Sequence, residues 1–64
     1  MQPLNNNQDQ VAAVRRDVQA RIMAAMETGN HGVARTTLRE YSEYYPAQAA
    51  DIAMDVLTAY GVYL

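Results

Sequence analysis

Apolar side chains recur three or four positions apart along most of this chain, which is the spacing of one face of an α-helix. The first such series contains Val11, Val14, Val18, Ile22 and Ala25, with Met23 and Met26 widening the same face. Asn7 with Gln10 three residues later is similar to a capping box, and Gly29 supplies a stop. The pattern therefore predicts a first helix over residues 8–28, preceded by a flexible arm over residues 1–7.

Two further helices are predicted on either side of Pro46. Asn30 is a favourable N-cap, and a proline cannot continue a helix that began before it, so the second helix is predicted over residues 31–45. Its apolar face contains Val33, Ala34, Leu38, Tyr41 and Tyr45. Because proline suits the first turn of a helix, the third helix is predicted over residues 46–60. The expected fold class is all-α, with the three helices in one domain.

The third helix has more apolar surface than a solvent-facing helix needs. Its polar residues are Gln48, Asp51, Asp55 and Thr58, and their spacing puts them on one narrow stripe. A surface helix needs an apolar stripe only a little more than about 100° wide. We therefore expect a second chain to cover part of this helix. An antiparallel hairpin that turns at Pro46 predicts two ion pairs, Arg39–Asp51 and Arg35–Asp55.

The short length limits the stability that one copy of the chain can reach. A domain over residues 8–64 rarely gains more than about 3–5 kcal/mol from its own core, and the 64-residue sequence has no cysteine to form a disulfide. Self-association into a helical homo-oligomer is therefore expected. The net charge of −2 is mild, but all five cations are arginines before Glu40, whereas only acids follow. These two charged regions can pair within one chain or between chains.

Other classes of protein are excluded by what the sequence lacks. No apolar run approaches the roughly 20 residues that cross a bilayer, and the first residues do not have the pattern of a signal peptide; we expect a cytoplasmic protein without a membrane partner. His31 has no nearby carboxylate with which to bind a metal, and Ser42 has no adjacent base to make it a nucleophile. We expect no enzyme activity, no catalytic residue, no metal and no cofactor.

One segment resembles a known helical repeat. The order Gly29, Ala34, Leu38, Tyr41 and Pro46 is similar to the second helix of a tetratricopeptide repeat. The resemblance covers residues 18–46, but Val18 and Ile22 stand where the family has an aromatic residue and a glycine. It implies a stacking helical hairpin that binds peptides or proteins. A single repeat cannot bury its own apolar face, so it also implies a neighbouring repeat, cap or subunit.

Tyrosine is the strongest indication of function, because it is enriched at protein interfaces. The expected function is a non-catalytic adaptor or regulator, with a protein-binding surface drawn from Tyr41, Tyr44, Tyr45, Met54, Leu57 and Tyr60. One alternative is a small DNA-binding regulator whose basic face contains Arg15, Arg16, Arg21, Arg35 and Arg39. Another is a structural subunit of a larger assembly such as a phage particle.

Overall fold

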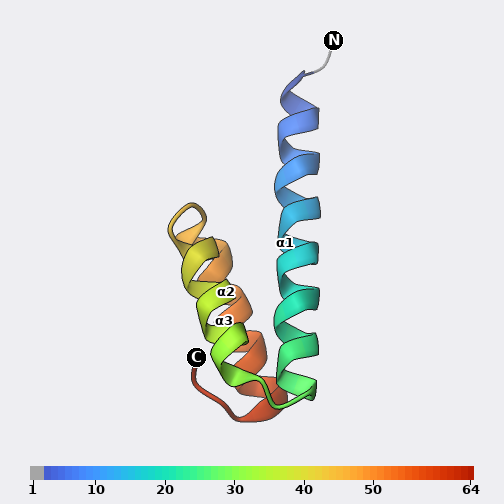
Figure 1. Ribbon diagram of the computed structural model, residues 1–64. Helices are drawn as coiled ribbons and strands as arrows, with labels where there is room; N and C mark the ends of the chain where they lie inside the picture. The colour runs from blue at the N-terminus through green and yellow to red at the C-terminus, as the bar shows by residue number, and fades with distance from the viewer. Residues whose placement is uncertain (1–2) are drawn as a thin grey trace.

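The chain forms three helices, as Figure 1 shows for the computed structural model. The structure describes the backbone of residues 3–64 and the side chains of residues 10–64. In chain order the helices are α1 (Pro3–Glu27), α2 (His31–Ser42) and α3 (Pro46–Tyr60). α2 and α3 form an antiparallel hairpin that packs against the C-terminal part of α1 (Figure 1). The predicted all-α, three-helix class is therefore confirmed.

α1 begins at Pro3, five residues before the predicted start at residue 8. Residues 3–7, which we predicted to be a flexible arm, lie in its first turns, while residues 1–2 lie outside the described residues. Asn7 is therefore inside the helix and is not its cap. The physical reason is that asparagine costs a helix only about 0.7 kcal/mol relative to alanine, and a proline at the first position favours helix initiation.

The turn between α1 and α2 follows the sequence prediction closely. Gly29 has φ of 79°, the left-handed conformation that glycine adopts without a steric penalty. The Asn30 side chain then accepts a hydrogen bond from the Val33 N–H at 3.4 Å. This bond satisfies one of the backbone donors that have no partner within the first turn of α2.

α2 ends at Ser42, three residues earlier than predicted, whereas α3 has the predicted bounds. The ring of Pro46 disfavours a helical conformation at the preceding residue, and Tyr45 is not helical, with φ of −138° and ψ of 68°. The effect of this proline therefore reaches back into the turn at residues 43–45. Gly61 closes α3 with φ of 71°, and its N–H donates to the Leu57 carbonyl at 2.8 Å.

The core lies where the hairpin meets α1. Its largest fully buried side chains are Ile22, Ile52 and Val56, one from α1 and two from α3. α2 adds Ala34, Leu38 and Tyr41, while Ala25, Met26 and Ala49 complete the cluster. The N-terminal part of α1, blue in Figure 1, extends beyond the tip of the hairpin and has neither α2 nor α3 beside it. Val14 is 42% exposed although it continues the apolar face.

Candidate protein-binding surface

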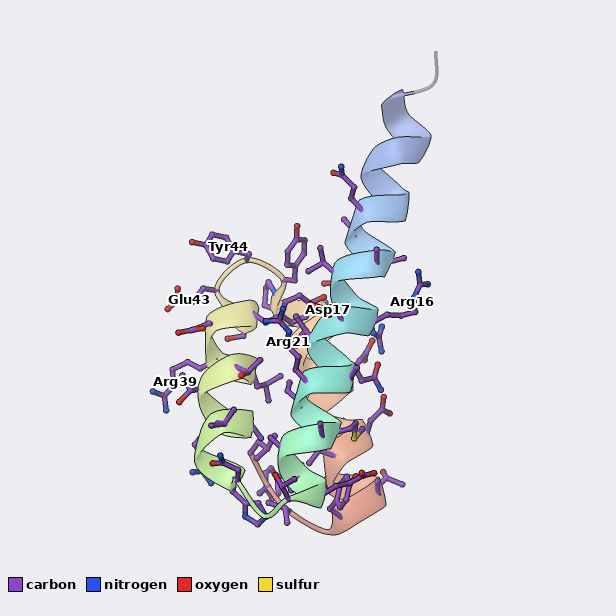
Figure 2. The ribbon with its side chains drawn as sticks, turned by 45° about the vertical axis from the view of Figure 1, so that its right-hand side comes forward. Arg16, Asp17, Arg21, Arg39, Glu43 and Tyr44 are labelled. Atoms are coloured by element: carbon purple, nitrogen blue, oxygen red, sulfur yellow. The ribbon has the colours of Figure 1, made fainter. Side chains whose placement is uncertain are left out.

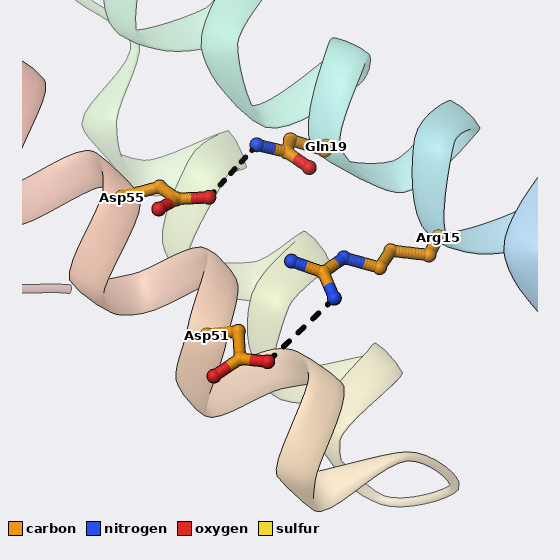
Figure 3. Close-up of polar contacts among 4 residues, drawn as sticks. All are labelled: Arg15, Gln19, Asp51 and Asp55. Carbon is orange, nitrogen blue, oxygen red and sulfur yellow. Dashed lines mark hydrogen bonds and ion pairs between the residues drawn. The ribbon is translucent and has the colours of Figure 1, made fainter.

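Three polar contacts join α1 to α3, and we call them the polar seam. Arg15 Nη1 lies 3.6 Å from Asp51 Oδ2, and Gln19 Nε2 donates to Asp55 Oδ2 at 3.1 Å (Figure 3). Nearer the C-terminal end of both helices, the Tyr60 hydroxyl donates to Glu27 Oε2 at 3.4 Å. The residue numbers rise together along both helices, so α1 and α3 run parallel. Asp51 and Asp55, the two acids of the polar stripe of α3, therefore face α1.

The predicted ion pairs Arg39–Asp51 and Arg35–Asp55 are wrong. Within the described side chains, neither arginine forms an ion pair with either aspartate. Both predictions placed the aspartates on the α2 side of α3, whereas Figure 3 shows them directed at α1. The sequence did contain a signal for the observed pairing. Arg15 and Gln19 are one helical turn apart, as are the two aspartates, so the two pairs match in register.

A groove runs between α2 and α3, and we call it the α2–α3 groove. It has a volume of about 460 Å³ and is lined by Arg35, Leu38, Arg39, Ser42, Pro46, Ala49, Ala50, Ala53 and Leu64. None of these residues comes from α1, and Figure 1 shows the C-terminal end on the side of the hairpin away from α1. Small and apolar side chains make up most of the lining. The groove is therefore an apolar surface with two cationic side chains.

Sequence reasoning missed this groove because a groove depends on how two helices pack. Alanines at positions 49, 50 and 53 lie together on α3, and their short side chains leave the space that other residues would fill. The Ser42 hydroxyl is occupied locally, since it donates to the Arg39 carbonyl at 2.7 Å. A run of alanines opposite two arginines one turn apart is the signal that could have predicted the groove.

The predicted tyrosine cluster separates into a buried part and an exposed part. Tyr41 is only 6% exposed, and its ring lies 5.2 Å from that of Tyr45, measured between centroids. Burial raises the pKa of the Tyr41 hydroxyl, although the nearby Arg15 guanidinium lowers it and Tyr45 raises it further. Tyr44 is 78% exposed at the tip of the hairpin, and Figure 2 shows it directed away from the helices. Tyr44 is therefore free to contact a partner, whereas Tyr41 is a core residue.

The predicted residues of α3 also differ in exposure. Met54 is 60% exposed, Leu57 is half-buried, and Tyr60 is at the edge of the polar seam. Burial raises the pKa of the Tyr60 hydroxyl, as do the charge of Glu27 and the hydrogen bond to it. The exposed methionine agrees with the expectation that α3 has more apolar surface than its neighbours cover.

The five arginines do not gather on one face of the molecule. Arg15 is bound to Asp51, and Arg21 Nη2 lies 3.2 Å from Asp17 Oδ2 within α1. Figure 2 shows Arg16 and Arg39 on opposite sides of the molecule. Arg35 and Arg39 share the α2–α3 groove. A nucleic acid would therefore meet separate cations and not one continuous basic surface.

The described residues contain no cluster of three or more side chains suited to hold a metal ion, and His31 is exposed at the first position of α2. No described helix combines the length and the apolar character needed to cross a bilayer. Comparison with protein-family models, curated proteins and solved structures finds no match to this chain. The tetratricopeptide resemblance therefore stays a prediction.

Proposed function

We propose that this chain is a non-catalytic protein-binding module, an adaptor or regulator, and that its partner binds the α2–α3 groove. The observation that supports this proposal is an apolar groove with two arginines on a face that α1 does not cover. Recognition of a helix by an apolar groove is a common mode of protein binding. Arginine is also among the residues enriched at protein interfaces.

The exposed apolar side chains extend this surface. Met54 on α3 and Tyr44 at the hairpin tip are large, exposed side chains that a partner can bury. Flexible methionine side chains adapt to the shape of a partner. The proposed surface therefore retains these two predicted residues, omits the buried Tyr41, and adds Arg35 and Arg39.

Self-association is a second part of the proposal. Among the described side chains, only Ile22, Ile52 and Val56 are both large and fully buried, and a small core alone gives little stability. A second copy that covers Met54 or Val14 would bury further apolar area. Light scattering over a range of protein concentrations tests this proposal, and a monomer at all concentrations that still unfolds cooperatively would contradict it.

The test of the binding function compares two variants that each add a large side chain to an exposed alanine. Ala50→Phe adds a ring in the groove, whereas Ala20→Phe adds one on the exposed side of α1. Proteins captured from the native cell by the wild-type chain are identified by mass spectrometry, and the capture is repeated with both variants after circular dichroism has verified their folding.

We expect at least one protein to be captured by the wild-type chain and by Ala20→Phe but lost with Ala50→Phe. The added ring blocks the groove sterically, while the control changes hydrophobicity by the same amount elsewhere. A set of captured proteins that is the same for all three chains would contradict the groove as the binding site.

A further inference from the structure

We propose that the occupant of the α2–α3 groove is an acidic amphipathic helix, whose carboxylates one turn apart pair with Arg35 and Arg39. This inference rests on the proposed protein-binding function and specifies the chemistry of the partner. Its basis is that one groove contains both two arginines and an apolar lining.

The two arginines are spaced for helix recognition. Arg35 and Arg39 are four residues apart on α2, so they stand about one turn apart on the same side of the helix, and both line the groove. Among the described side chains, neither has a carboxylate within the 4.0 Å of an ion pair. Arg15 and Arg21, by contrast, already have acidic partners. The charges in the groove are therefore available to an external anion.

The groove offers a partner apolar contact beside these charges. Leu64 contributes a large, half-buried side chain, while the exposed Ala50 and the half-buried Ala53 allow a close approach. An amphipathic helix presents an apolar stripe with polar residues along its edges. Such a helix can place apolar side chains over the alanines and carboxylates beside the arginines. Arginine is well suited to this role because its guanidinium binds a carboxylate through two parallel hydrogen bonds.

Other occupants fit the groove less well. A nucleic acid needs several cations along its phosphates, whereas this groove supplies two and has an apolar lining that phosphates do not use. A second copy of the chain could bring Asp51 and Asp55, but these carboxylates are bound by Arg15 and Gln19 in the polar seam. Its exposed Glu40 and Glu43 lie beside its own Arg35 and Arg39, whose charges would oppose those in the groove. Both occupants are nevertheless outcomes of the experiment.

The experiment uses labelled synthetic helical peptides that differ at only two positions. All have the same leucine stripe, and the two flanking positions one turn apart hold glutamate, glutamine or lysine. Binding to the full chain is measured by fluorescence anisotropy at low and at physiological salt. Measurements are repeated with the double variant R35E/R39E and with the control R16E, which reverses an exposed arginine of α1 outside the groove. Circular dichroism verifies that each variant is folded, and light scattering measures its oligomeric state.

We expect the glutamate peptide to bind more tightly than the glutamine peptide, by about tenfold at low salt, and the lysine peptide to bind weakest. R35E/R39E should reverse this order, because glutamates would then attract the lysine peptide, whereas R16E should preserve it. Higher salt should reduce the difference.

Equal binding of the three peptides, or no binding of any, would overturn the inference. A contrary result is a short DNA duplex that binds the wild type in competition with the glutamate peptide and fails to bind R35E/R39E. That result would instead identify a nucleic-acid site. If light scattering shows that R35E/R39E alone dissociates an oligomer, the occupant is a second copy. These results are distinguishable from failure of the proposed function, because Ala50→Phe tests the groove itself without reference to the partner's charge.

Discussion

Tyr41 combines a buried ring with a hydroxyl that has no hydrogen-bond partner among the described residues. The sequence predicted its position on the apolar face of the second helix, but it also suggested a contact with a partner protein. Side-chain type alone cannot separate these roles, because tyrosine suits both a core edge and an interface. Tyr41 and Tyr44 show the difference. Tyr41 lies on α2, whereas Tyr44 lies in the turn before Pro46.

The raised pKa of Tyr41 predicts a loss of stability in alkali. Burial favours the neutral phenol, so the pKa in the folded state lies above the ordinary value of 10.0, whereas the unfolded chain ionises near that value. The stability is therefore complete below about pH 10 and falls as the pH rises above it. Urea unfolding at neutral and alkaline pH should show a smaller alkaline loss for Tyr41→Phe than for the wild type. The control Tyr63→Phe, at an exposed position, should behave as the wild type; equal losses in all three would contradict the assignment.

Two glycines near the start of α2 should respond in opposite directions to the same substitution. Gly29 has φ of 79°, whereas Gly32 lies within α2, and a Cβ at either position would meet no described atom within 4 Å beyond its chain neighbours and the local helix backbone. Steric contacts of the new methyl group therefore do not distinguish the two substitutions, and only the backbone conformation differs. Gly29→Ala should lower the free energy of unfolding by about 1 kcal/mol, while Gly32→Ala should raise it by roughly 0.5–1 kcal/mol. Thermal unfolding measures both changes in the free energy of unfolding, and the same sign for both would contradict the prediction.

At the scale of elements, the polar seam lies along the contact between the hairpin and α1. Hydrophobic spacing and the residues that start or stop helices predicted all three helices, and Pro46 and Gly61 predicted the bounds of α3 without error. Hydrophobic spacing could not predict which side of α3 would face α1, because several faces of that helix are apolar. In the observed arrangement, Arg15 and Gln19 match Asp51 and Asp55 in register.

Double-mutant cycles can distinguish the observed pairing from the one that the sequence suggested. The pair of Arg15 and Asp51 is partly exposed, so changing both residues to alanine should show a coupling free energy of about 0.2–1 kcal/mol that declines in high salt. The matched cycle for Arg39 and Asp51 should show none, because these two form no ion pair. Chemical denaturation of the single and double variants provides both values, and a larger coupling in the second cycle would restore the original prediction.

For the whole molecule, few large side chains support the fold. Ile52 is fully buried between the helices, and replacing it with alanine typically costs about 2–5 kcal/mol. A domain of this size has only about 3–5 kcal/mol available, so Ile52→Ala should be largely unfolded in the absence of a partner. Ile52→Val should fold with a loss of roughly 0.5–1.5 kcal/mol. Circular dichroism tests both, and a cooperatively folded Ile52→Ala would show that another interaction, such as self-association, supplies stability.

The parallel arrangement of α1 and α3 has a consequence for the order of folding events. Each turn joins helices that are neighbours in sequence, whereas Gln19 and Asp55 in the polar seam are 36 positions apart. Closing a long loop costs more entropy than closing a short one, so the seam should form after the folding barrier has been crossed. Asp51→Ala should therefore accelerate unfolding and leave the refolding rate nearly unchanged in stopped-flow experiments. In this way the seam would determine how long the chain stays folded but not how quickly it folds.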